Sequence, residues 1–313
     1  MKRCVLGIDT SNYTTSLSLV GEDLSLIANI KVPLPVKEGE RGLRQSDAVF
    51  AHVKNFPVAF EQLSKHLQEY EIAAVGVSTR PRNQEGSYMP CFLVGHDMAL
   101  AIASTKGIPL YTWSHQCGHI TAALYGANQL DLMHGEFGAF HISGGTTELV
   151  RVTFAENGYH AEVVGGSKDL HAGQAIDRIG VAMGLPFPAG PHMEVLASTF
   201  GGKVQKRSPK CEECYIHLSG LENLALDLYR QTQDKQATAA FVYQYVGAGI
   251  EKMSQQFREK FGDLPLVYAG GVMSSAILQK RLSQLKDTHF APAALSADNA
   301  VGIAVNTALK FFS

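Results

Sequence analysis

Apolar residues occur in short runs along the whole chain, separated by glycine, proline and polar residues. The first run, Cys4 to Ile8, leads through a polar turn into a second run, Ser16 to Val20, and this pattern predicts a β-hairpin. Helical periodicity follows from Phe50 to Tyr70, and Ala73 to Ser78 has the composition of a buried strand. The chain therefore begins with strands and a helix that packs on them.

Helix and strand then alternate. A helix is predicted from Phe92 to Lys106, a strand from Pro109 to Trp113 and a further helix from His115 to Tyr125. Because connecting helices cover the faces of a parallel sheet, this alternation predicts a mostly parallel sheet with covered faces.

The strand-turn-strand design restarts in the middle of the chain. Gly138 to Ile142 enters a glycine turn and returns as Glu148 to Val152, as at the N-terminus. Such a restart indicates duplicated halves. The later predicted elements are four helices, Ala172–Met183, Leu224–Tyr229, Ala237–Phe261 and Asp298–Phe312, and a strand, Pro265–Ala269.

Composition narrows the class of protein. The chain has 313 residues, of which 45% are hydrophobic and 18% charged, and this suits two globular cores rather than one. The net charge of -2 gives no general positive field, so nucleic-acid binding would need a local patch or a partner. Cysteines are sparse, no apolar run approaches the roughly 18 residues of a membrane span, and the first run breaks at Asp9. We therefore expect a cytoplasmic protein without membrane association.

Two histidines stand four residues apart at the start of a predicted helix. His115 and His119 would project from one helix face, and this spacing suits two ligands of one metal ion. A third ligand would have to come from elsewhere in the chain. Two histidines held only by hydrogen bonds explain the pair equally well. Cys117 faces away from them and is assigned to packing or exposure.

Two glycine pairs each follow a strand. The segment from Ser143 to Thr147 offers backbone N–H groups that could cradle phosphate oxygens, although a plain hairpin turn has the same pattern. The segment from Ala269 to Val272 opens a predicted helix, whose N-terminus favours an anion or an adenosine. Each signal is weak alone, and together they favour a nucleotide site.

Other polar residues leave alternatives open. Asp177 lies on an otherwise apolar helix face, where it could bond a ribose hydroxyl or form a salt bridge with Arg178 or another neighbour. Asp298 stands at the start of the last predicted helix, where an aspartate N-cap needs no further function. Cys211 and Cys214 are too few for a tetrahedral zinc site and are interpreted as incidental.

In their order along the chain, these motifs resemble the TsaD and Gcp-like threonylcarbamoyl-transferase family, once labelled O-sialoglycoprotein endopeptidases. The resemblance covers nearly the whole chain. Six segments of the chain are each similar to a motif of the family: His115–His119 is similar to HxEGH, Ser143–Thr147 to SGGHT, Gly173–Ile179 to GEAxDKV, Leu185–Pro191 to LGLPYPGGP, Ser219–Leu221 to FSGLK and Gly270–Val272 to GGV.

The resemblance implies an α/β protein with the two-lobed ASKHA fold of actin and sugar kinases, built from duplicated mixed-sheet domains. One lobe would comprise residues 1–110 with the C-terminal helix 299–313 packed on it, and the other residues 111–298, with most of the metal and nucleotide site. The family also implies one divalent metal ion, iron or zinc, bound by His115, His119 and Asp298. ATP or an acyl-adenylate would rest on small and polar residues: Ser143, Gly144, Gly145, Thr146, Asp177, Gly190, Gly271 and Ser275.

Members of the family transfer a threonylcarbamoyl group from its adenylate to an adenosine beside the tRNA anticodon. The resemblance therefore implies contact with tRNA through partner subunits, and a hetero-oligomer with a related ASKHA protein. The chain departs from the family's motifs at the acidic pair after Asn12, where Tyr13 and Thr14 stand. Cys117, Thr146 and Ser275 replace Glu, His and Asn of the motifs, and the lysine of FSGLK is either replaced by Glu222 or lost by a shift of the alignment. These departures indicate a divergent paralogue.

Three functions are compatible with this pattern. The first is transfer of a threonylcarbamoyl or related group to tRNA, and the second is a regulatory or partner-binding module that binds nucleotide without transfer. The third is a carbamoyltransferase with another acceptor. The older peptidase label has no support, because the chain has no HExxH motif and Gln116 occupies the position of the catalytic glutamate.

Overall fold

The computed structural model describes residues 1–11, 13–35, 43–155 and 158–313. The chain forms two compact units. The first comprises Met1–Met133, Phe154–His160 and Leu295–Ser313, and the second comprises His134–Thr153 and Ala161–Ala294. None of the described helices combines the length with the apolar composition that crossing a bilayer would take.

The first unit contains a mixed sheet with the strand order β3-β2-β1-β4-β5. β1 (Lys2–Thr10) pairs antiparallel with β2 (Thr14–Gly21), which confirms the predicted N-terminal hairpin. β2 also pairs antiparallel with β3 (Leu26–Pro33), a strand that the sequence did not predict. On the other side, β1 pairs parallel with β4 (Tyr70–Arg80), and β4 with β5 (Leu110–Ser114).

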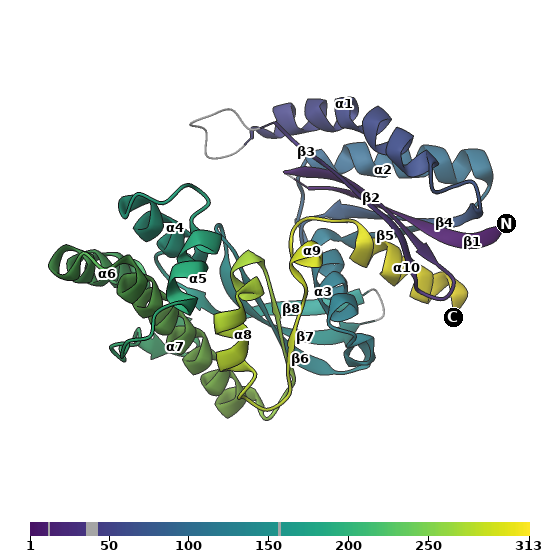
Figure 1. Ribbon diagram of the computed structural model, residues 1–313. Coiled ribbons are helices and arrows are strands. Elements are labelled where there is room, and N and C mark those ends of the chain that lie inside the picture. The colour runs from purple at the N-terminus through teal and green to yellow at the C-terminus, as the bar shows by residue number, and fades with distance from the viewer. Residues whose placement is uncertain (12, 36–42, 156–157) are drawn as a thin grey trace. The chain divides into compact units, whose positions relative to one another are not determined.

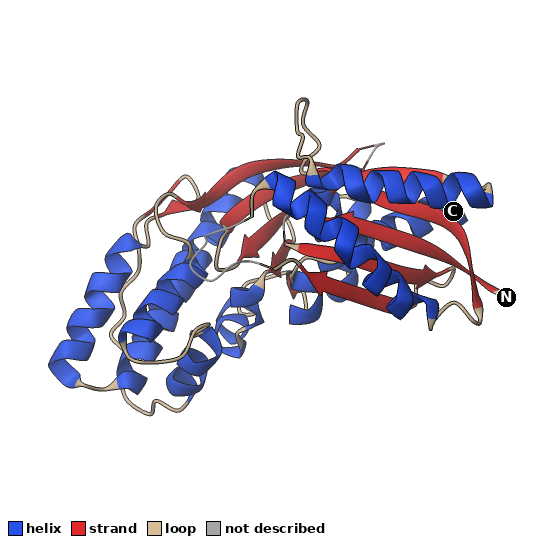
Figure 2. Ribbon diagram, turned by 90° about the horizontal axis from the view of Figure 1, so that it is seen from above, coloured by secondary structure: helices blue, strands red, loops and turns tan. Residues whose placement is uncertain are grey.

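Two helices, α1 (Gln45–Ser64) and α2 (Cys91–Lys106), cover one face of this sheet. Successive strand residues point to opposite faces, so Leu6 and Ile8 of β1 are buried with Phe56 of α1. Figure 1 shows α1 and α2 on the same side of the strands of this sheet, and Figure 2 shows the same molecule from above, with helices in blue and strands in red.

The opposite face packs against α10 (Val301–Phe312), where Val5 is buried with Ala304. α3 (His115–Gly126) packs in turn on α10. The sequence predicts a domain boundary after residue 110, but the first unit continues to Met133 because α3 packs against α10.

The second unit contains a sheet with the order β12-β11-β6-β7-β8-β10-β9. Within it, the order β8-β7-β6-β11-β12 repeats the order of the first sheet. The strand directions agree as well, because β6 is antiparallel to β7 and parallel to β11, as β1 is to β2 and β4. This repetition confirms the duplicated halves. The strands are β6 (Glu136–Ile142), β7 (Thr147–Ala155), β8 (Gly158–Ser167), β9 (Cys211–Glu212), β10 (Tyr215–Ile216), β11 (Leu266–Ala269) and β12 (Thr288–Phe290).

Helices of the second unit enclose a large apolar core around the long helix α7 (Lys235–Phe261), in which Phe257 and Ile250 are buried with Tyr268 of β11. The remaining helices of the chain are α4 (Ala172–Ala182), α5 (Gly190–Ser198), α6 (Ser219–Thr232), α7 (Lys235–Phe261), α8 (Ala276–Leu282), α9 (Ala293–Ser296) and the 3-10 helices η1 (Leu130–His134) and η2 (Gly271–Ser274).

Candidate functional site

The first turns of α3 bring two histidines together. The buried hydroxyl of Ser114 accepts a hydrogen bond from the backbone N–H of Cys117 at 3.1 Å, so the helix begins at His115. His119 follows one turn later, and the two Nε2 atoms lie 2.9 Å apart. The thiol of Cys117 is buried and accepts a hydrogen bond from Asn83, which assigns this cysteine to packing.

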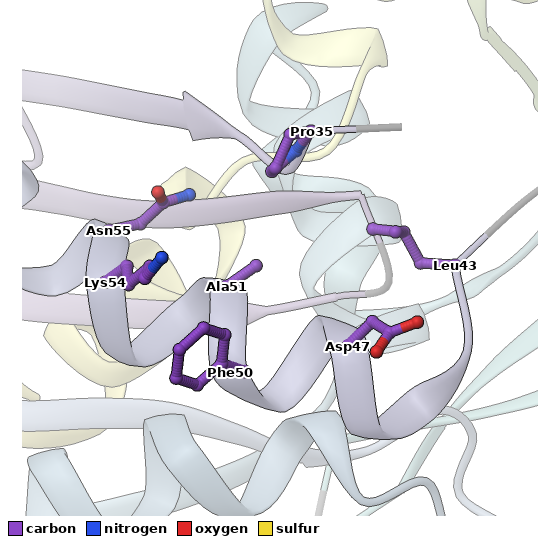
Figure 3. Close-up of a pocket in the computed structure, with 7 residues that line it drawn as sticks. All are labelled: Pro35, Leu43, Asp47, Phe50, Ala51, Lys54 and Asn55. Carbon is purple, nitrogen blue, oxygen red and sulfur yellow. The ribbon is translucent and has the colours of Figure 1, made fainter. Parts of the chain in front are cut away.

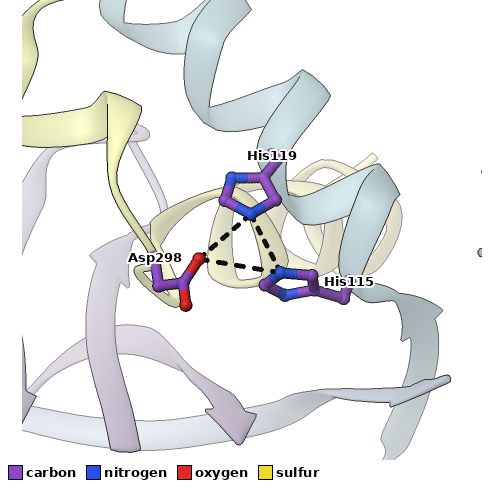
Figure 4. A group of neighbouring side chains, drawn as sticks. All are labelled: His115, His119 and Asp298. Atoms are coloured by element: carbon purple, nitrogen blue, oxygen red, sulfur yellow. Dashed lines mark hydrogen bonds and ion pairs between the residues drawn. The ribbon is translucent and has the colours of Figure 1, made fainter. Parts of the chain in front are cut away.

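Asp298 reaches the histidines from the loop before α10. The sequence interpretation of Asp298 as the helix N-cap is wrong: α10 begins at Val301, and the side chain of Asn299 accepts the hydrogen bond of the Val301 N–H at 2.9 Å. The Asp298 carboxylate instead turns toward the helix, with Oδ1 3.3 Å from Nε2 of His119 and 3.8 Å from Nε2 of His115 (Figure 4).

Two glycines allow this approach. A Cβ atom on Gly302 of α10 would overlap the backbone carbonyl of Gly118 of α3, and a Cβ on Gly118 would lie 3.0 Å from Ile303. Because neither residue has a side chain, the two helices pack backbone to backbone. The loop that carries Asp298 therefore lies beside the first turns of α3.

Two further side chains orient His115 and Asp298. Oδ1 of Asp9, at the end of β1, lies 2.9 Å from Nδ1 of His115, and the hydroxyl of Ser11 donates a hydrogen bond of 2.6 Å to Oδ2 of Asp298. Asp9 is fully buried, and within the described part of the chain its Oδ2 atom has no hydrogen-bond partner. The sequence reasoning missed both residues, although the break of the first apolar run at Asp9 is a visible signal.

These contacts shift the pKa values of His115 and Asp298. Burial alone would lower the pKa of His115, but the charges of Asp9 and Asp298 and the hydrogen bond with Asp9 raise it to about 9. Burial would raise the pKa of Asp298, whereas hydrogen bonds from His119 and Ser11 and the charges of both histidines hold it below its ordinary value. The group therefore places an ionised Asp298 carboxylate beside a His115 imidazole that holds its proton more tightly than a free histidine does.

The donor set fits a divalent metal ion. One atom from each of His115, His119 and Asp298 can be chosen so that all lie within 4.8 Å of one another, in the single such group found among the described residues. Two imidazole nitrogens and one carboxylate oxygen suit zinc and iron alike. The side chains of His115, His119 and Asp298 remain 18%, 24% and 21% exposed, so an ion bound to them would be open to a further ligand.

The second unit contains a pocket of about 360 Å³, within the size range of small-molecule sites. Five of the eight residues predicted to hold the nucleotide line it: Gly144, Asp177, Gly190, Gly271 and Ser275. The other three, Ser143, Gly145 and Thr146, belong to the turn between β6 and β7 and are not part of its lining; the N–H of Ser143 donates a 2.8 Å hydrogen bond to the Thr146 carbonyl.

Glycines of this pocket fall into two kinds. A Cβ atom on Gly144, Gly190 or Gly271 would meet no other atom within 4 Å, so these positions leave open space for a ligand. In contrast, a Cβ on Gly173 would lie 2.6 Å from the Ser143 carbonyl oxygen. Gly173 therefore serves the close packing of α4 on the turn.

Asp177 holds the rim of the pocket. Its Oδ1 atom accepts hydrogen bonds from the backbone N–H groups of Ala189 at 2.8 Å and Gly190 at 3.3 Å. The alternative salt bridge with Arg178 does not form, because Arg178 lies 3.5 Å from Glu222 instead.

Two pocket residues were missed by the sequence reasoning. Oε1 of Glu194 accepts a 2.8 Å hydrogen bond from Ser275, and the hydroxyl of Tyr243 donates one of 3.0 Å to the Gly190 carbonyl. Ser275 also caps α8, by accepting a hydrogen bond from Leu278. The sequence predicts one helix after the second glycine pair, and the structure has two short helices there, η2 followed by α8. Glu194 lies on α5, a helix that the sequence did not predict because the proline-rich segment at its start indicates a loop.

Three other features lie outside the metal group and the nucleotide pocket. The Cys211 thiol lies 3.3 Å from Oε1 of Gln256, and burial raises the pKa of Cys211 to about 11, so this thiol stays protonated and packs. A second pocket lies along α1, where Phe50 and Lys54 face outward (Figure 3). Tyr13 is 52% exposed in the turn after β1, and Asn12 beside it lies outside the described residues.

Comparison with known families and proteins gives a consistent result. The family model described as TsaD, tRNA N6-adenosine threonylcarbamoyltransferase, matches residues 36–305. A tRNA N6-adenosine threonylcarbamoyltransferase of Streptococcus equi subsp. zooepidemicus is 30% identical over 330 residues, which cover 99% of this chain and 92% of that protein. One of Thermus thermophilus is 29% identical and covers 96% of this chain and 91% of its own length.

Solved structures resemble the fold at low sequence identity. HypF of T. kodakarensis matches with a TM-score of 0.61 and 11% identity, over 99% of this chain and 47% of that one. Component A of (R)-2-hydroxyglutaryl-CoA dehydratase from Acidaminococcus fermentans matches with a TM-score of 0.54 and 12% identity, over 99% of both chains. These likenesses confirm the predicted ASKHA fold.

Proposed function

Because the chain belongs to the TsaD family of tRNA N6-adenosine threonylcarbamoyltransferases, we propose that it transfers a threonylcarbamoyl or related carbamoyl group from an acyl-adenylate to an acceptor. The convergence of His115, His119 and Asp298 carries this proposal. Asp298 is far from the two histidines in the sequence, and a binding module without chemistry would have little reason to keep all three ligands together.

One divalent metal ion, iron or zinc, is the proposed cofactor. His115, His119 and Asp298 would hold it, and when bound it supplies a Lewis acid that polarises an acyl oxygen. Asp9 fixes the tautomer of His115 by occupying Nδ1, which leaves Nε2 as the nitrogen that faces the other ligands. Ser11 fixes one oxygen of Asp298 and leaves the other to the histidines.

The nucleotide part of the donor is assigned to the pocket of the second unit. Its open glycines, among them Gly144 and Gly271, let a ligand approach the backbone closely. The carboxylates of Asp177 and Glu194 are suited to accept hydrogen bonds from ribose hydroxyls. ATP and an acyl-adenylate share both the adenine and the ribose, so either is a ligand of this pocket.

The proposed acceptor is a tRNA adenosine, reached with partner subunits such as a related ASKHA protein, and this role would place the protein in the cytoplasm. One observation favours a second candidate, transfer to a different acceptor. Tyr13 stands where the family's acidic pair begins, and its half-exposed side chain presents a phenol in place of a carboxylate. The group that meets the acceptor is thus changed, while the ligand set is kept.

Purified protein with its metal quantified tests the proposal when it is incubated with threonylcarbamoyl-adenylate and tRNA. The variants His115→Ala and Asp177→Ala should lose transfer, the first with loss of metal and the second with loss of nucleotide. His66→Ala and Asp131→Ala, at exposed positions, are the matched controls.

The proposal is supported if wild type and both controls form modified tRNA and the two site variants do not. Binding of metal and nucleotide without modified tRNA would leave the second acceptor or a regulatory module as the function. Absence of both ligands would refute the proposed chemistry.

A further inference from the structure

A histidine outside the proposed ligand set is buried next to it. His52 lies on α1 and is 0% exposed. Its Nδ1 atom lies 2.8 Å from the hydroxyl of Thr15, and its Nε2 atom lies 2.8 Å from the backbone carbonyl oxygen of Ser11. Both ring nitrogens are therefore used, one on Thr15 of β2 and the other on Ser11, which directly follows β1.

The directions of these hydrogen bonds follow from chemistry. A carbonyl oxygen can only accept, so the proton of the ring must be on Nε2. Burial lowers the pKa of His52, which keeps the ring neutral and leaves Nδ1 as an acceptor for the Thr15 hydroxyl. His52 thus receives one hydrogen bond from Thr15 and donates one to Ser11.

Ser11 connects His52 to the proposed ligands. The last paired residue of β1 is Thr10, so Ser11 lies beyond the strand pairing. Its carbonyl accepts from His52, and its hydroxyl donates a 2.6 Å hydrogen bond to Oδ2 of Asp298. Ser11 is 3% exposed, so water does not replace either contact.

We propose that His52 is a positioning residue for the metal group: by holding the Ser11 carbonyl, it keeps the Ser11 hydroxyl on Asp298 and so keeps the other Asp298 oxygen turned toward His119. The inference rests on the proposed metal site. It places a buried outer partner behind Asp298, as Asp9 stands behind His115, and partners of this kind orient metal ligands.

Two substitutions separate the two sides of the imidazole. In His52→Gln the amide N–H takes the place of Nε2–H and can still donate to Ser11. In His52→Asn the shorter amide oxygen can take the place of Nδ1 opposite Thr15, but the side chain no longer reaches Ser11. Both variants lose the ring, and they differ from each other by one methylene group, so urea unfolding of each variant is needed to separate packing from hydrogen bonding.

Co²⁺ is the probe, because its visible absorption reports the geometry of its ligands as well as its affinity. His52→Asn should bind Co²⁺ about 10–100-fold more weakly than wild type with an altered spectrum, whereas His52→Gln should restore most of both. Ser11→Ala should reproduce the loss of His52→Asn, and the double variant should lose little more, because both act through one hydrogen-bonded path. Urea unfolding measures the stability of each variant.

Equal weakening in His52→Gln and His52→Asn, or fully additive losses with Ser11→Ala, would overturn the inference in favour of a general packing role. Wild-type affinity in His52→Asn would also overturn it, while leaving the metal site intact. Wild type that binds Co²⁺ no better than His115→Ala would remove the metal site itself, and the inference with it. The comparison of wild type with His115→Ala therefore separates failure of the proposed function from failure of the inference.

Discussion

The Nδ1 atom of His115 lies 2.9 Å from a carboxylate oxygen of Asp9, which is buried at the end of β1. This contact fixes the ring and leaves Nε2 toward His119 and Asp298. A carboxylate behind a ligand histidine raises the basicity of the ring and selects its tautomer. The relationship makes Asp9 part of the candidate metal centre although it offers no atom to the ion.

Replacement of Asp9 by Asn tests this role. The amide keeps the shape of the side chain and loses the charge, so the variant should bind Zn²⁺ about 10–100-fold more weakly in competition with a chromophoric chelator. Asp97→Asn, at an exposed carboxylate, should bind as wild type does. Equal affinities of Asp9→Asn and wild type would show that Asp9 has no part in metal binding.

Neighbouring glycines should respond differently to alanine. Gly270 has a φ of +103°, and a Cβ there would overlap the backbone of Ile142, so Gly270→Ala should lose about 1–3 kcal/mol of unfolding free energy from backbone strain, with the overlap adding to it. Gly271→Ala meets no atom within 4 Å and should keep its stability within about 0.5 kcal/mol, yet bind ATP more weakly because it lines the pocket. Urea unfolding and calorimetric titration with ATP measure the two effects. ATP binding by Gly271→Ala equal to that of wild type would argue against this pocket as the nucleotide site.

His52 makes stability depend on pH. Its pKa is lowered from 6.5 by burial, so below pH 6.5 the unfolded chain binds a proton that the folded chain resists. The stability contributed by the neutral ring is therefore complete above pH 6.5 and is lost as the pH falls through the folded-state pKa. Since glutamine does not titrate, the stability of wild type relative to His52→Gln should decline between pH 7.5 and 5. Parallel unfolding curves for the two proteins across this range would contradict the assignment.

Local patterns predicted much of the fold. The hairpin of β1 and β2 and the helices α2, α4 and α7 were predicted within a few residues, because their apolar positions recur with a strand or helix period. β3 was not predicted, because its exposed edge position leaves few of its residues buried. α5 begins directly after a proline-rich loop, which reads as a break in structure rather than as the start of a helix.

The candidate site was less accessible to local patterns. The spacing of His115 and His119 predicts two ligands on one helix face, but the Ser11–Asp298 hydrogen bond joins residues 287 positions apart. Asp298 came from the resemblance alone, and its local context favoured an N-cap. His52 and Glu194 carry no motif, and they became visible only through their burial and hydrogen bonds.

Anomalous diffraction at the absorption edge of the bound metal, from crystals of the purified wild-type protein, tests the central claim most directly. The account predicts one strong peak in contact with the Nε2 atoms of His115 and His119 and an oxygen of Asp298, and no such peak in His115→Ala crystals. A metal peak located elsewhere, or no peak after soaking with zinc or iron while the three side chains remain hydrogen-bonded to one another, would contradict it.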